Sequence, residues 1–92
     1  MMIVIKKTGI KENFEISKIR RSIANAAGDI NIILTESDLS NACKMIENAI
    51  KEIRSEETSS YEIFGAVVFK LHELNYSEVV QSYIRGSLGT VK

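Results

Sequence analysis

The chain opens with an apolar stretch and a turn, followed by side chains that alternate between apolar and polar with a period of two. Residues 3–5 are β-branched and apolar, Thr8-Gly9 supplies the turn, and the alternation runs from Ile10 to Phe14. Alternate residues of a strand face the same side of a sheet. The pattern therefore predicts a β-hairpin over residues 3–14, with Glu12 and Phe14 on one face of its second strand.

Beyond the hairpin, apolar side chains recur at spacings of three and four residues, which predicts helices. The longest apolar stripe runs over four turns and begins after Thr35, which forms an acidic capping box with Asp38. Ser59 and Glu62 form a second capping box before the third helix. The predicted helices cover residues 17–28, 36–54, 60–74 and 77–87.

These elements predict one α+β domain over residues 1–92, in which a hairpin precedes four short helices that can pack as a bundle. A chain of 92 residues and 10.3 kDa fits a single domain. Its apolar runs are too short for a membrane span, and its early charged residues are unlike a signal peptide. The lone Cys43 has no disulfide partner within the chain, so we expect a reduced, cytoplasmic protein.

The formal net charge is zero, which argues against a general nucleic-acid or membrane binder. The charge is nevertheless unevenly distributed. Residues 1–34 carry six basic and three acidic side chains, a net charge of +3, whereas residues 35–92 carry six basic and nine acidic ones, a net charge of −3. The first third of the chain is therefore the place to look for an anionic ligand.

The sequence contains no recognisable catalytic or metal-binding constellation, so we predict that the domain is not an enzyme. His72, the single histidine, lies on a predicted helix without an evident partner. Cys43 lies on the apolar stripe of the second helix, where a buried cysteine acts as a small hydrophobic residue.

Neither a P-loop nor a dinucleotide glycine pattern occurs. A phosphate site would therefore be built from basic side chains and helix N-termini. The hairpin offers Lys6 and Lys7, the first predicted helix offers Lys18, and the cap at Ser59-Ser60 offers hydroxyls and N–H groups. These groups converge only if the third helix starts beside the hairpin, which periodicity does not show.

Three segments together resemble a known domain family. Residues 4–23 read V-I-K-K-T-G-I-K-E-N-F-E-I-S-K-I-R-R-S-I, residues 59–63 read S-S-Y-E-I, and residues 78–85 read E-V-V-Q-S-Y-I-R. The first resembles the opening pattern of ATP-cone domains, V-x-K-(R/K)-(D/N)-G-x-x-E-x-F-(D/N)-x-x-K-(I/L)-x-x-(A/S)-I. The other two are similar to the family's S-S-x-x-I segment and its closing helix, so the resemblance spans about residues 3–88.

The resemblance implies a small sheet capping a four-helix bundle and a regulatory role without catalysis. ATP-cones bind ATP or dATP, and Mg²⁺ is expected to accompany the triphosphate. They occur in ribonucleotide reductases and in the repressor of reductase genes. The implied function is to sense nucleotide and to control the activity or oligomerisation of a partner, a ribonucleotide reductase, or of the chain itself by self-association.

Carried over position by position, the resemblance implies a phosphate site. Lys6 and Lys7 match the family's basic pair that meets the phosphates. Lys18 matches the lysine of the first helix near the triphosphate, and Ser60 matches a hydroxyl residue that contacts the sugar–phosphate end.

At the base, Val4 and Ile19 match apolar positions, and Glu12 matches the acidic residue that accepts a hydrogen bond from the adenine amino group. Two nucleotide-site positions depart from the pattern. Glu15 stands where the family has Asp or Asn, which would bring a second carboxylate to the base. Phe64 stands where some members have histidine and many have glycine, which replaces a polar contact with bulk.

Two other functions remain as alternatives. A degenerate ATP-cone would act as a nucleotide-independent protein-interaction module, for which Met45, Phe69 and Tyr76 are candidate contact residues because they lie off the main apolar stripes. A nucleic-acid binder is disfavoured by the zero net charge and by the shortness of the basic stretch.

Overall fold

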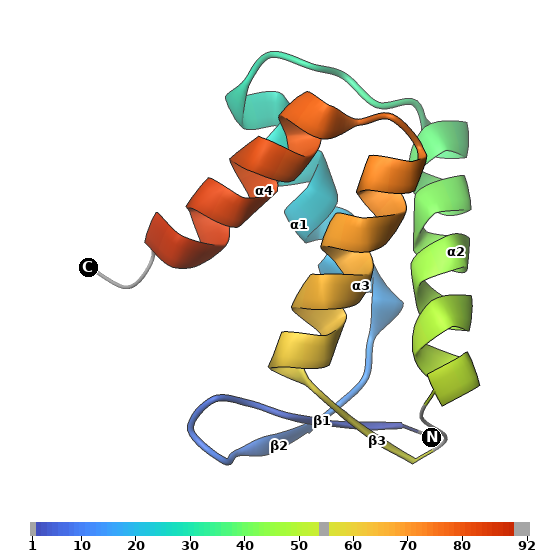
Figure 1. Ribbon diagram of the computed structural model, residues 1–92, viewed down its shortest axis with the longest axis vertical. Helices are drawn as coiled ribbons and strands as arrows, with labels where there is room; N and C mark the ends of the chain where they lie inside the picture. The colour runs from blue at the N-terminus through green and yellow to red at the C-terminus, as the bar shows by residue number, and fades with distance from the viewer. Residues whose placement is uncertain (1, 54–55, 90–92) are drawn as a thin grey trace.

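Within residues 2–53 and 56–89, which the computed structural model describes, a three-stranded sheet lies at one end of four helices (Figure 1). The predicted α+β class is therefore correct. The elements are β1 (Ile3–Ile5), β2 (Lys11–Asn13), α1 (Ile16–Asp29), α2 (Glu36–Ile53), β3 (Glu57–Ser59), α3 (Ser60–Glu73) and α4 (Ser77–Gly89). The helices begin and end within two residues of the predicted limits, and the predicted end of the second helix, Arg54, lies outside the described residues.

The predicted hairpin is formed by β1 and β2, which pair antiparallel with Val4 opposite Glu12. Lys6 N donates to Ile10 O at 2.8 Å, and Gly9 N donates to Lys6 O at 2.9 Å, which closes the turn. Gly9 has a backbone φ of +87°, a conformation that residues with a Cβ atom rarely adopt. The turn therefore depends on glycine at this position.

The sequence patterns did not reveal the third strand. Glu57–Ser59 forms β3, which pairs parallel with β1 and makes β1 the central strand in the order β2-β1-β3. In this register Ser59 lies opposite Ile5. The next residues along the two chain segments are Ser60, which begins α3, and Lys6, which follows β1. The parallel pairing therefore starts α3 beside the hairpin, as Figure 1 shows.

Each helix packs against two others, since α1 contacts α2 and α4, and α3 also contacts α2 and α4. The most deeply buried large side chains come from all four helices: Ile23, Ile46, Val67, Leu71 and Val79. Burying such a side chain stabilises a fold by about 1.5–3 kcal/mol relative to exposure. The apolar stripes of the sequence thus meet in one shared core.

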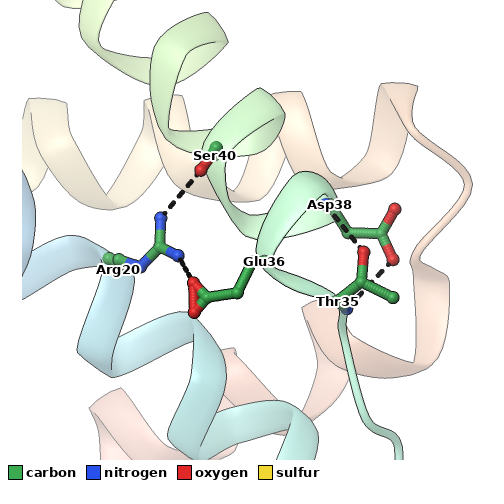
Figure 2. Close-up of polar contacts among 5 residues, drawn as sticks. All are labelled: Arg20, Thr35, Glu36, Asp38 and Ser40. Atoms are coloured by element: carbon green, nitrogen blue, oxygen red, sulfur yellow. Dashed lines mark hydrogen bonds and ion pairs between the residues drawn. The ribbon is translucent and has the colours of Figure 1, made fainter.

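The predicted capping boxes set where α2 and α3 begin. Asp38 N donates to Thr35 Oγ1 at 3.0 Å, and Thr35 N donates to Asp38 Oδ2 at 3.2 Å, which confirms the reciprocal box before α2 (Figure 2). Before α3, Glu62 N donates to Ser59 Oγ at 3.1 Å, while the Glu62 carboxylate accepts a hydrogen bond from Thr58 Oγ1 at 2.9 Å. The side chains of this second cap therefore tie β3 to α3.

Arg20 links α1 to the start of α2 (Figure 2). Its guanidinium forms an ion pair with Glu36 and donates to Ser40 Oγ at 3.1 Å. Part of the early positive charge is thus engaged between two helices. The lysines of the hairpin and of α1 remain as the candidates for an anion site.

Candidate functional site

A cavity of about 360 Å³ lies where the sheet meets the helices. Its wall is formed by the hairpin, the first half of α1, the start of α3 and the second half of α4. All nine predicted nucleotide-binding residues line it: Val4, Lys6, Lys7, Glu12, Glu15, Lys18, Ile19, Ser60 and Phe64. The residues that sequence reasoning did not assign to the site are Phe14, Ser22, Tyr61, Ile63, Tyr83 and Ser87.

Three lysines line the cavity. Lys6 and Lys7 come from the end of β1 and the turn, and Lys18 comes from the first turn of α1. The parallel pairing of β3 with β1 adds the start of α3, including Ser60. This arrangement meets the condition for the predicted groups to converge, namely that α3 begins beside the hairpin.

Two carboxylates lie among these lysines. Glu12 Oε1 is 3.7 Å from Lys6 Nζ and 3.5 Å from Lys18 Nζ, so one oxygen contacts two ammonium groups. Glu15 Oε2 lies 3.7 Å from Lys18 Nζ. These side chains are 36–55% exposed, so each ion pair contributes little to stability, on the order of 0–1 kcal/mol. An anion that binds these lysines would have to displace the two carboxylates from them.

Lys7 differs from the other two lysines in its surroundings. Its ammonium lies 5.9 Å from the centre of the Tyr61 ring, in the range of a cation–π contact. A second hollow, of about 290 Å³, lies over the hairpin turn and shares four lining residues with the main cavity: Lys6, Lys7, Glu12 and Ser60. The basic groups therefore line two adjoining spaces.

Aromatic and apolar side chains form another part of the lining. The rings of Phe64 on α3 and Tyr83 on α4 stack with centres 5.7 Å apart and planes inclined by 26°. Burial raises the pKa of the Tyr83 phenol, and its hydrogen bond with Ser87 lowers the pKa by a smaller amount. The phenol is therefore neutral near pH 7 and able to donate a hydrogen bond. Ile19 and Ile63 complete an apolar wall suited to a flat ring.

Ser60 is the start of α3 and lines both hollows. Its Oγ is buried and has no hydrogen-bond partner among the described residues. Buried polar atoms in proteins are nearly always hydrogen-bonded, so an unpaired one at a cavity indicates a place for a polar ligand atom. The sequence pattern had placed this hydroxyl at the sugar–phosphate end of a ligand.

The other residues singled out from the sequence have ordinary environments. Cys43 is buried, as predicted, and burial raises the pKa of its thiol, while the charge of Arg20 lowers it by less. Met45 is half-buried and Tyr76 packs against the core, but Phe69 is 58% exposed. Of these three candidate contact residues, Phe69 is therefore the one that is largely exposed.

The described part of the chain has neither a helix suited to spanning a membrane nor a cluster of side chains suited to holding a metal ion. Within residues 2–53 and 56–89, no helix is both long enough and apolar enough to cross a membrane. The same residues contain no group of three or more His, Cys, Asp or Glu side chains placed to hold a metal ion.

The fold and the cavity together define a small α+β domain in which basic, aromatic and apolar residues line one cavity. The family model of the ATP cone domain matches residues 2–86, which is nearly the whole chain. The chain therefore belongs to the ATP-cone family, as its sequence pattern had indicated. ATP-cone domains are nucleotide-binding regulatory modules whose ligand is ATP or dATP. A search of curated proteins returned no match.

Proposed function

We propose that the cavity binds ATP or dATP, together with Mg²⁺, and that the bound nucleotide controls a protein partner. The observation that carries this proposal is the convergence of residues from the hairpin, α1 and α3 on one cavity of about 360 Å³. Those residues are distant in sequence and were singled out from the sequence alone, by their charge, by their place at a helix cap and by the family pattern. A volume of this size is within the range of small-molecule sites.

In this proposal the triphosphate lies against the three lysines of the cavity. Lys6, Lys7 and Lys18 neutralise it, and the N–H groups of Ser60 and Tyr61 at the start of α3 donate to it. Three charge-assisted contacts at about 1.5–3 kcal/mol each allow micromolar affinity after the costs of association. Mg²⁺ shares the charge of the triphosphate with these lysines.

The base lies against the wall that includes Val4, Ile19 and the stacked ring of Phe64. Glu12, which pairs with Val4 across the hairpin, and Glu15 are then the acceptors for the adenine amino group. The buried hydroxyl of Ser60 gains a hydrogen-bond partner from the sugar or the first phosphate.

Regulation follows from the position of the cavity, because its wall includes both the sheet and three helices. A nucleotide that binds two packings of these elements with different affinity shifts the balance between them. The output is a change in self-association or in contact with a partner, for which a ribonucleotide reductase is our first candidate. We place this activity in the cytoplasm.

The test is calorimetric titration of ATP, dATP and GTP into the protein with Mg²⁺. We expect ATP or dATP to bind with micromolar affinity and the double variant Lys6→Ala plus Lys7→Ala to bind at least tenfold more weakly. Lys44→Ala is the control, because Lys44 is exposed on α2 and does not line the cavity. Absence of binding at millimolar ATP and dATP would overturn the proposed function, and unchanged affinity of the double variant would overturn the phosphate assignment alone.

A further inference from the structure

Glu12 occupies an unusual position for a residue assigned to base recognition. It lies in β2 opposite Val4, and its half-buried side chain points between two lysines that the proposed function gives to phosphates. A single oxygen, Oε1, is 3.7 Å from Lys6 Nζ and 3.5 Å from Lys18 Nζ. Within this structure the carboxylate therefore takes the place between the ammonium groups that a phosphate oxygen takes in an anion complex.

We infer that Glu12 makes the site select nucleotides over inorganic polyphosphates. This inference rests on the proposed function and concerns the same cavity. Glu12 is an internal counter-charge that any incoming triphosphate must displace from Lys6 and Lys18. It becomes satisfied again only when the ligand also brings a hydrogen-bond donor, such as the amino group of a base.

The physical argument is a comparison of two ligands with the same charged group. An inorganic triphosphate that takes both lysines leaves the Glu12 carboxylate beside an anion, with neither lysine paired to it. Like charges a few ångströms apart repel, and a carboxylate that loses its partners without gaining others carries a further penalty. A nucleotide meets the same repulsion but supplies N–H donors from its base. An unfavourable contact that penalises the competitor is a general source of specificity.

Glu15 provides a graded comparison within the same site. Its carboxylate contacts Lys18 alone, at 3.7 Å, and its side chain is 55% exposed, against 36% for Glu12. Water therefore screens Glu15 more effectively, and its removal ends one ion pair rather than two. We expect it to discriminate between the two ligands less than Glu12 does.

The test measures the affinity of ATP and of inorganic tripolyphosphate by calorimetry, at one Mg²⁺ concentration and one ionic strength. The variants are Glu12→Gln, Glu15→Gln and the control Glu57→Gln. Glu57 Oε2 lies 3.6 Å from Lys11 Nζ, and neither residue lines the main cavity, so the control removes the same charge and one exposed ion pair. Thermal unfolding of each variant shows that it is folded at the temperature of the titration.

In Glu12→Gln we expect tripolyphosphate to bind about five- to tenfold more tightly. We expect ATP to gain less than tripolyphosphate does, because ATP also loses the carboxylate that accepts a hydrogen bond from its base. The preference for ATP over tripolyphosphate then falls, and in Glu15→Gln it falls by only about twofold. The control keeps the preference of the unmodified protein within twofold.

Three outcomes would overturn the inference. An unchanged preference in Glu12→Gln, with ATP still bound and dependent on Lys6 and Lys7, refutes the role of Glu12 and leaves the proposed function standing. An equal change in the control refutes it as well, because the effect is then one of overall charge. Failure of both ligands to bind the unmodified protein at millimolar concentration refutes the proposed function and the inference together.

Discussion

Replacing Phe64 with alanine tests whether the aromatic wall receives the base. The ring lines the cavity, is half-buried and stacks on Tyr83 with a centre distance of 5.7 Å. Stacking of a base on an aromatic side chain contributes about 1–3 kcal/mol by alanine substitution. Because Phe64 already has one face against Tyr83, we take the lower half of that range. Each 1.4 kcal/mol is a factor of ten, so Phe64→Ala should weaken ATP binding about five- to thirtyfold.

The same substitution also lowers stability, and the experiment must separate the two effects. An aromatic pair contributes about 0.5–1.5 kcal/mol beyond its buried area, and truncating a half-buried ring costs less than the 3–5 kcal/mol typical of a core phenylalanine. A loss of about 1–3 kcal/mol corresponds to a Tm lower by roughly 4–8 °C per kcal/mol in a domain of this size. The titration should therefore be made well below the Tm of the variant.

Inorganic tripolyphosphate is the matched ligand for this measurement, since it has no base to stack. Its affinity should change by less than twofold in Phe64→Ala, in contrast to the tightening expected of Glu12→Gln. If ATP binds the alanine variant as well as or better than the unmodified protein, the ring does not receive the base, and the aromatic wall of the cavity has been assigned wrongly.

Three further predictions concern one site residue and two buried ones. Lys18→Met should weaken ATP binding, measured by calorimetry, about tenfold, because one charge-assisted contact is lost. It should change the free energy of unfolding by less than about 1 kcal/mol, because the ion pairs of Lys18 are exposed. An equal loss of affinity in Lys44→Met would contradict this assignment. Ser82→Ala should lower the free energy of unfolding, measured in urea, by about 1–2 kcal/mol. The reason is that the buried Ser82 Oγ donates to Ala26 O at 2.7 Å and so joins α4 to α1. An unchanged free energy of unfolding would show that this hydrogen bond makes no net contribution. Burial raises the pKa of the Cys43 thiol above its ordinary value of 9.0. The unfolded chain therefore loses this proton at a lower pH than the folded protein does, and the free energy of unfolding falls as the pH rises. The urea midpoint should decline above about pH 9, with a shallower decline in Cys43→Ala.

Local patterns in the sequence determined most of the secondary structure. Spacings of three and four residues located four helices because each helix buries one face against the others, as Ile23 and Ile46 do. The boxes at Thr35 and Ser59 located two helix starts because the bonds that satisfy the first N–H groups are made within a few residues. The family pattern selected residues that line the cavity, although it could not show that they meet.

The tertiary structure alone decided how those residues come together. The strand Glu57–Ser59 has no apolar alternation, since its sequence is E-T-S, and it is held by backbone bonds to a strand more than fifty residues earlier. Such pairing leaves no signal in a local window, yet it is what brings Ser60 to Lys6. The aromatic partner Tyr83 and the sharing of Glu12 by two lysines are likewise contacts between separate elements. The sequence by itself thus determined which charged and apolar groups are available, and the packing of sheet against helices decided that they line one cavity.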